Sequence, residues 1–179
     1  MLPTGHVAAG YMTAYALIRV TNPHLPPEQL DQLLWWGMFF GFAPDIDVFW
    51  FFIKTKGLLV SPNVNISHRF YISHAPIVWL VAGVTVAAFS ASEYWRSVGL
   101  LMWLGTWSHF LLDSIESGVM WLWPKQKVYA LWNVGKKFHI EEKRFFRHSL
   151  LFLKKYSTQP TFYAELVVLA AACIIYFSN

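Results

Sequence analysis

The fold of this chain is decided by its longest apolar stretch, Val98–Trp123, which reads VGLLMWLGTWSHFLLDSIESGVMWLW. A helix needs about 20 mostly apolar residues to cross the hydrocarbon core of a bilayer, and this stretch is long enough. It contains His109 and Asp113, which are four residues apart and therefore share one face of a helix. Ionisable groups inside a span are costly and by default indicate function. The stretch predicts a membrane helix with a pair that either binds an ion or forms a buried hydrogen bond.

The composition of the whole chain agrees with a membrane protein. Of the 179 residues, 56% are hydrophobic and 13% are charged, against roughly 25% charged residues in an ordinary soluble domain. No linker, charge block or repeat divides the sequence, so we expect one membrane-embedded domain over residues 1–179. We expect an all-α polytopic helical bundle with four to five transmembrane helices, formed by Gly5–Val20, Leu33–Ile53, Pro76–Phe89, Val98–Trp123 and Thr161–Phe177.

The basic residues predict how the bundle is oriented. With five crossings, every Lys and Arg except Arg19 and Arg96 falls on one side. By the positive-inside rule, the N-terminus and both long loops are then cytoplasmic. In the second long loop, Val128–Lys155 mixes aromatic residues with clustered cations, which is typical of a basic amphipathic helix lying on anionic membrane lipids. A basic loop that only sets the topology is the alternative.

Cysteine usage restricts the kind of metal site, and the position of the basic residues argues against a nucleic-acid partner. Cys173 is the one cysteine, so neither an intrachain disulfide nor a thiolate zinc cluster can form. Any metal must therefore be held by nitrogen and oxygen. The net charge is +4, but basic residues beside membrane spans more often record topology, and we expect no nucleic-acid partner.

The second stretch is interrupted by Ala43-Pro-Asp-Ile-Asp47. Pro44 weakens the helix ladder, and broken backbone at membrane depth is tolerated where it lines a cavity. The carboxylates of Asp45 and Asp47 could bridge a pair of cations, or one could bind a metal while the other accepts a proton from water. A solvated turn that ends a short span is the alternative.

A third motif, Ser67-His-Arg-Phe-Tyr-Ile-Ser-His74, supplies two imidazoles, His68 and His74, with Arg69 between them. Neutral imidazole is the commonest metal ligand, and the guanidinium fork suits a phosphate. An ordinary polar loop is the alternative.

The predicted topology brings all these side chains to one membrane face. The first span starts on that face, the second and fourth spans run toward it, and the His74 motif lies in a loop on the same side. Structural polar residues scattered along a chain would have no reason to converge in this way. We expect a metal site formed by His6, Asp45, Asp47, His68, His74, His109 and Asp113.

The ordered set of motifs resembles the YdjM-like family of predicted inner-membrane metal-dependent hydrolases. The matching features are His6, Pro44–Asp47, the His-Arg motif followed by His74, and the His109 to Asp113 pair. That family is thought to be distantly similar to zinc-dependent phospholipase C and nuclease P1. The resemblance implies an inner (plasma) membrane location and metal-assisted phosphoester hydrolysis. It departs where Phe70 and Tyr71 replace small residues and where a second His-x-x-x-Glu pair is not evident.

The resulting hypothesis is a membrane-bound metal-dependent hydrolase that cleaves a phosphoester, lipid-linked or other, at the cytoplasmic interface. The metal would acidify water and offset phosphoryl charge, with Asp45 or Asp47 as base or bridging ligand and Arg69 assisting the transferring group. The His-rich set favours Zn²⁺, and Mn²⁺ or Fe²⁺ is also compatible. The alternative is a non-enzymatic membrane protein that transports or senses a divalent cation. A metal-independent lipid phosphatase would need a Pro-Ser-Gly-His segment that the chain lacks.

Overall fold

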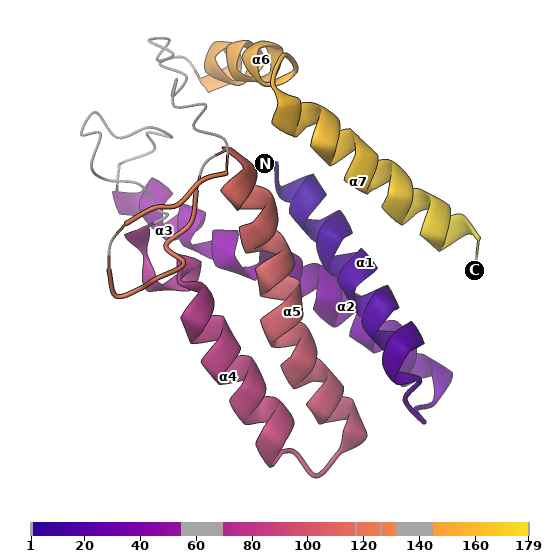
Figure 1. Ribbon diagram of the computed structural model, residues 1–179. Coiled ribbons are helices and arrows are strands. Elements are labelled where there is room, and N and C mark those ends of the chain that lie inside the picture. Colours follow the sequence, from indigo (N-terminus) through magenta and orange to yellow (C-terminus); the bar gives the residue numbers. More distant parts are fainter. Residues whose placement is uncertain (1, 55–69, 117, 126, 132–144, 179) are drawn as a thin grey trace.

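The computed structural model describes residues 2–54, 70–116, 118–125, 127–131 and 145–178 (Figure 1). Within these ranges the chain is helical, as predicted, and one isolated antiparallel bridge joins Val119 to Tyr129. The helical elements are α1 (Pro3–Thr21), α2 (Pro27–Phe42), η1 (Ala43–Ile46), α3 (Asp47–Lys54), η3 (Ile72–His74), α4 (Pro76–Phe89), α5 (Glu93–Glu116), α6 (Phe145–Tyr156) and α7 (Pro160–Phe177).

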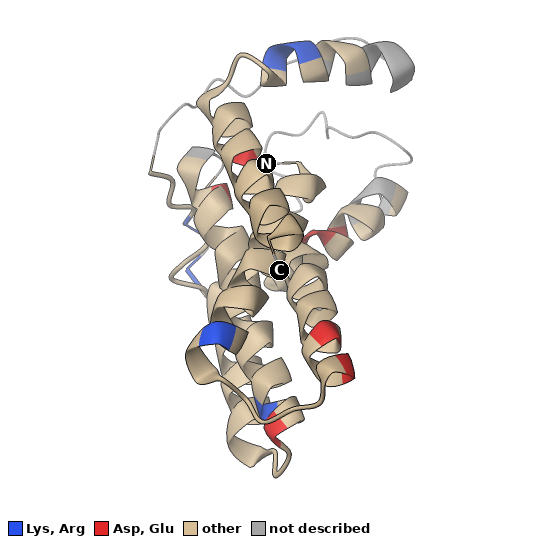
Figure 2. Cartoon of the chain, turned by 90° about the vertical axis from the view of Figure 1, so that its right-hand side faces the viewer, with Lys and Arg blue, Asp and Glu red and all other residues tan. Residues whose placement is uncertain are grey.

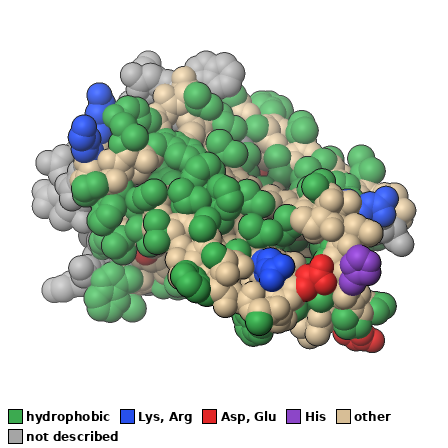
Figure 3. Space-filling view, turned by 60° about the horizontal axis from the view of Figure 1, so that its bottom comes forward, with side chains coloured by type: hydrophobic (Ala, Val, Ile, Leu, Met, Phe, Trp, Pro, Cys, Tyr) green, Lys and Arg blue, Asp and Glu red, His purple; other side chains and the backbone are tan. Residues whose placement is uncertain are grey.

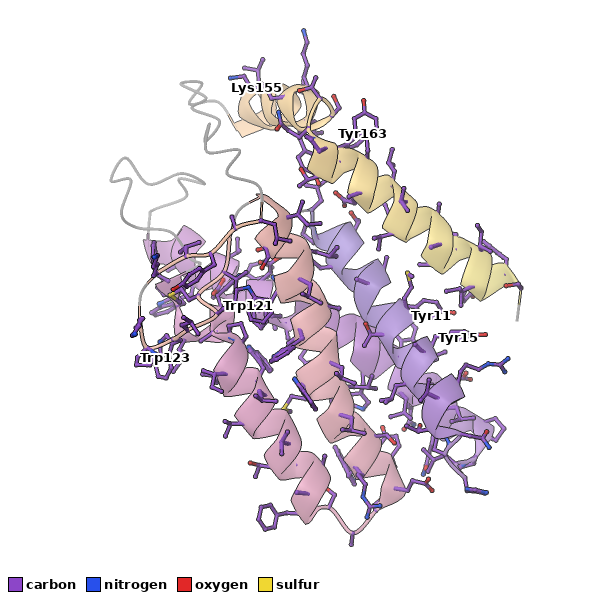
Figure 4. The ribbon with its side chains drawn as sticks, in the orientation of Figure 1. Tyr11, Tyr15, Trp121, Trp123, Lys155 and Tyr163 are labelled. Carbon is purple, nitrogen blue, oxygen red and sulfur yellow. The ribbon has the colours of Figure 1, made fainter. Side chains whose placement is uncertain are left out.

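The long helices run up and down beside one another (Figure 1). Helices α1 and α2 form one antiparallel pair and α4 and α5 form a second, and α5 packs against both α1 and α2. Helix α7 lies along α1 (Figure 1). Tyr11 of α1, labelled in Figure 4, meets Tyr176 of α7 edge to face. Helix α6 lies across the end of the bundle at which the chain begins. The N-terminus and α6 therefore share one end.

Glycines allow the helices to pack with their backbones in contact. A Cβ atom on Gly10 of α1 would lie 2.1 Å from the carbonyl oxygen of Gly37 in α2. A Cβ atom on Gly83 of α4 would lie 2.6 Å from the carbonyl oxygen of Gly99 in α5. Such close approach is typical of helix packing inside membranes, where small residues let the backbones come together and van der Waals packing drives association. Close backbone packing at these glycines therefore holds each helix pair together.

The second and fourth predicted spans differ most from the helices, which begin earlier, at Pro27 and Glu93, and end earlier than predicted, while the predicted interruption at Pro44 is confirmed. The predicted span Leu33–Ile53 is divided into α2, η1 and α3, because Pro44 ends the α-helical ladder. The predicted span Val98–Trp123 extends only to Glu116, because the chain turns at Gly118, whose φ of +78° favours glycine. Helix α6 covers the end of the predicted amphipathic segment, and residues 132–144 of that segment lie outside the described ranges.

One described helix, α7, is long and apolar enough by length and composition to cross a membrane, and α4 is a shorter apolar helix. The predicted four to five crossings therefore remain a prediction. Helices α1 and α5 carry glycines and polar side chains such as His6, His109 and Asp113 on their buried faces, which lowers their apolar content, and α2 has only 16 residues.

The surface of the bundle is largely apolar. Figure 3 shows hydrophobic side chains over much of the face in view, with Lys, Arg, Asp and Glu mostly near its margins. In Figure 2 most charged segments lie toward the two ends of the bundle, and α6 carries the blue pair Lys154 and Lys155. This distribution is the one expected for a protein embedded in lipid.

Candidate metal centre

The helix break after α2 positions two groups of the site, the Gly41 carbonyl and Asp45. Pro44 has no N–H to donate, so the α-helix gives way to the tighter turn η1. Hydrogen bonds in such a turn reach back three residues instead of four, which leaves the Gly41 carbonyl available to a side chain. It accepts a hydrogen bond of 2.9 Å from Nδ1 of His109 in α5. The break therefore places Asp45 in the bundle and orients His109.

His109 presents its second nitrogen to the interior. Because Nδ1 donates to a carbonyl, the neutral ring carries its lone pair on Nε2. This atom is buried and has no hydrogen-bond partner among the described residues. The nearest carboxylate oxygens are Oδ1 of Asp45 at 3.7 Å and Oδ2 of Asp113 at 3.8 Å. A lone pair that faces two carboxylates needs a positive charge between them, either a proton or a metal ion.

His74 is held in a similar way from η3. Its Nδ1 donates to Oδ2 of Asp47 at 2.8 Å, and the Ser73 hydroxyl donates to the same oxygen. The indole N–H of Trp79 donates to the Ser73 carbonyl at 2.7 Å and fixes the turn. The other ring nitrogen, Nε2, lies 3.5 Å from Oδ1 of Asp45. A carboxylate that orients an imidazole from behind is typical of metal-binding histidines.

The electrostatics at His74 favour a positive charge. Burial by itself would lower the pKa of His74, but the carboxylates of Asp45 and Asp47 outweigh it and hold the pKa above its ordinary value. A metal cation between these groups would offset the negative charge of the two carboxylates, as the proton on His74 does.

His6 completes the cluster from the first turns of α1. Its Nε2 lies 3.4 Å from Oδ1 of Asp113, and its ring stacks on the ring of His109 with 3.8 Å between the centroids. Its Nδ1 has no hydrogen-bond partner in the part of the chain that the structure describes. His6 therefore brings α1 to the same point that α5, η1 and η3 reach.

Two groups of three residues could each hold a metal ion, and both include His109. The first comprises His6, His109 and Asp113, and the second comprises Asp45, His74 and His109; within each, one ligand atom per residue lies within 4.8 Å of the others. The measured separations of 3.4, 3.5, 3.7 and 3.8 Å are close to the roughly 3.3 Å between ligand atoms in a tetrahedral shell with bonds of about 2.0–2.1 Å. The nitrogen and oxygen donors suit Zn²⁺, Mn²⁺ or Fe²⁺.

Comparison with known proteins shows the family of the chain. Residues 1–179 match the YdjM inner membrane protein family. The chain belongs to this family. Its membership makes it an inner membrane protein, as predicted, and carries no statement about hydrolysis or about a metal. No curated protein and no solved structure gives a significant match.

The structure of this YdjM family member brings together five of the seven predicted ligands, and His74 is among them although Phe70 and Tyr71 precede it. Asp47 lies beside the cluster, where it contacts the Nδ1 side of His74 and leaves the Nε2 side to Asp45. His68 and Arg69 lie outside the described residues. The five clustered residues are His6, Asp45, His74, His109 and Asp113.

The five clustered side chains differ in their exposure to solvent. The side chains of His6, His74, His109 and Asp113 are at most 1% exposed, whereas that of Asp45 is 13% exposed. On another side the site is closed by Phe110, whose ring lies against both His74 and His109. Trp121, labelled in Figure 4, covers Phe110 and is fixed by a 2.8 Å hydrogen bond from its indole N–H to the hydroxyl of Ser114. Among the described residues of the cluster, Asp45 in η1 is therefore the one nearest to the surface.

Three supporting groups were missed by sequence reasoning. The Gly41 carbonyl and the Ser73 hydroxyl have no distinctive sequence signal, because one is main chain and the other is a common loop residue. Glu165 of α7 is different, because an acidic residue within a long apolar stretch is a signal by itself. It is 2% exposed and is bonded to the first turn of α1.

Proposed function

We propose that this protein is a membrane-embedded, divalent-metal-dependent hydrolase that cleaves a phosphoester at the membrane face on which α6 lies. One observation carries the proposal: side chains from four separate elements converge with the mutual spacing of a metal coordination shell, and the Nε2 lone pair of His109 points into it. A buried cluster of this kind has a high electrostatic cost unless a cation occupies it.

In this proposal His6, His74, His109, Asp45 and Asp113 hold the metal, and Zn²⁺ is favoured by the imidazole content. A bound divalent ion would supply Lewis-acid polarisation of an ester oxygen. Asp47 keeps Nε2 of His74 directed at the ion, and the Gly41 carbonyl does the same for His109.

Asp45 has a second role in the proposal, because it is the most exposed of the ligands. Its carboxylate can accept a proton from an attacking water at the open side of the site. Arg69 follows from its sequence position, five residues before His74, as the group that grips a phosphoryl oxygen. A lipid-linked phosphoester is the favoured substrate class because an inner membrane protein meets such molecules at this interface.

The proposal includes a topology of five crossings by α1, α2, α4, α5 and α7. The close glycine contacts of the two helix pairs support it, as does the position of α6 across one end. The excess of Lys and Arg in the segments at that end makes it cytoplasmic. A reporter fused after Asn179 should then lie outside the cytoplasm, and a cytoplasmic reporter would exclude five crossings.

The near-complete burial of four ligands also suits a second function, binding of a cation for transport or sensing without hydrolysis. Among the described residues, the buried ionisable groups other than Glu165 gather in this single cluster, which argues against a path of sites across the membrane. A sensing role needs no such path.

Purified protein in detergent provides the test. Metal content is measured together with hydrolysis of a panel of phosphodiesters and phospholipids, for the wild type and for Asp45→Asn and His109→Ala. The matched control is His24→Ala, because His24 is exposed and lies away from the cluster. We expect stoichiometric metal and hydrolysis in the wild type and the control, and loss of both in His109→Ala. A wild type without metal would refute the proposal, and metal without hydrolysis would favour the sensing role.

A further inference from the structure

Glu165 is a buried carboxylate in the apolar helix α7 that the proposed chemistry does not use. It is 2% exposed, and both of its oxygens are engaged. Oε1 accepts hydrogen bonds from the Thr4 hydroxyl at 2.6 Å and from the Gly5 N–H at 3.1 Å. Oε2 accepts from the Leu2 N–H at 3.4 Å and from the Tyr156 hydroxyl. A carboxylate at this depth is costly unless it is satisfied in this way.

The partners of Glu165 lie at the N-terminus of α1. This helix begins at Leu2 and Pro3 without a capping side chain, and its first turn has no acidic residue. A carboxylate from another helix therefore accepts hydrogen bonds from the first N–H groups and lies at the positive end of the helix dipole, and the Gly5 N–H divides its hydrogen bond between Glu165 and the Leu2 carbonyl. Glu165 acts as the cap that the local sequence of α1 lacks.

A carboxylate is required here because of which atoms it faces. The backbone N–H groups of Gly5 and Leu2 can only donate, and each lies against a different oxygen of Glu165. A glutamine would turn its NH₂ group toward one of these N–H groups in either orientation. The charge and both acceptor positions are thus part of the contact.

The contact is one residue away from the metal centre. Gly5 precedes His6, whose Nε2 lies 3.4 Å from Asp113 and whose ring stacks on His109. The space around Gly5 is filled by Glu165, since a Cβ atom there would lie 2.9 Å from Cγ of Glu165. The start of α7 therefore limits how the first turn of α1 can move (Figure 1).

We propose that Glu165 is a positioning residue for the metal centre, which holds the first turn of α1 so that His6 stays against Asp113 and His109. The inference rests on the proposed metal site but not on hydrolysis. It couples the helix that is long enough to cross the membrane to a ligand of the centre, and it makes α7 a part of the site.

Chemical modification of histidine tests the inference without a metal. Chelator-treated protein in detergent is reacted with diethyl pyrocarbonate, and modification of each histidine is followed by mass spectrometry. In Glu165→Gln we expect His6 to react several-fold faster while His74 and His109 keep their wild-type rates, because only the first turn of α1 is released. Thr4→Val, which removes one donor to Glu165, should act in the same direction with a smaller effect. Glu28→Gln, at an exposed position in the first turn of α2, is the control.

Binding of Co²⁺ tests whether the effect passes through His6. We expect Glu165→Gln to weaken Co²⁺ binding about tenfold in the wild-type background and to have no further effect in the His6→Ala background. A purely structural role for Glu165 would weaken binding equally in both backgrounds and would expose all three histidines together; either result overturns the inference. If the wild type hydrolyses no ester but Glu165→Gln still affects His6 and Co²⁺ binding as expected, the proposed function is refuted and the role of Glu165 stands.

Discussion

Gly41→Ala is the substitution that most directly tests how packing builds the metal centre. Gly41 contributes no side chain, yet its carbonyl orients His109 and its Cα faces α1. A Cβ atom there would lie 2.3 Å from the carbonyl oxygen of His6 and 2.9 Å from Cα of Gly10. All the nearest atoms are backbone, so no flexible side chain can move aside.

The size of the effect follows from these distances. Ordinary contact begins at 3.4 Å, so relief of the 2.3 Å contact requires α1 and α2 to separate by about 1 Å at His6. Metal sites tolerate departures of roughly 0.2 Å in ligand distance, so His6 would leave bonding range. We expect metal affinity to fall by at least about tenfold, and the free energy of unfolding to fall by about 1–3 kcal/mol from overpacking.

The assay is competition between the protein and a chromophoric chelator for Zn²⁺ or Co²⁺, with a thermal melt on the same sample. Gly105→Ala is the matched control, because its overlap is much smaller: its Cβ would lie 3.0 Å from Cβ of Phe40 and 3.6 Å from the nearest backbone atom. A folded Gly41→Ala protein that binds metal with wild-type affinity would refute the reasoning that helix contact sets the ligand distances.

Three further predictions follow from the same contacts. Asp47→Asn should weaken metal binding by about 10- to 100-fold without changing the stoichiometry, because it alters the support of His74 and leaves the facing ligand atoms in place; chelator competition measures this, and loss of one whole equivalent of metal would contradict it. The pKa of His74 is raised in the metal-free protein, so protons should compete with metal at a higher pH than at an ordinary histidine. Metal affinity should therefore rise as pH rises through that pKa, while the stability that the charged ring gives the metal-free fold is lost over the same interval. Metal titrations at several pH values check the rise in affinity, and melts of the metal-free protein check the loss of stability. Gly83→Ala, whose Cβ would lie 2.6 Å from the Gly99 carbonyl oxygen, should lower the melting temperature but leave the metal content unchanged, as measured by elemental analysis, because this contact is between α4 and α5 away from the ligands.

The helical class could be predicted from the sequence because it depends on local composition. The stretch Pro76–Phe89 was predicted with the bounds that α4 has, since Pro76 and Ser90 end the apolar run on both sides. The break at Pro44 could also be predicted, because a missing N–H acts on its own helix. The end of α5 could not, since the apolar run continues past Gly118 while the backbone turns.

The candidate ligands were chosen from the sequence by residue type and by depth along the predicted spans. The grouping of His6, Asp45, His74, His109 and Asp113 is a matter of distances between elements far apart in the chain, and the structure supplies those distances. From the sequence, Asp45 and Asp47 were equally good candidates for a metal ligand. Their different places, one facing the cluster and the other behind His74, follow from the turn η1.

The apolar stretch that contains His109 separates what depends on local sequence from what depends on tertiary packing. Sequence by itself determined that a helix forms there and that His109 and Asp113 share a face, because a period of 3.6 residues is a property of the local backbone. The tertiary structure alone decided which nitrogen of His109 faces inward, because that depends on the carbonyl of Gly41, 68 residues away along the chain. It also decided that Glu165 contacts the start of α1, because the packing of α7 against α1 joins residues 160 positions apart.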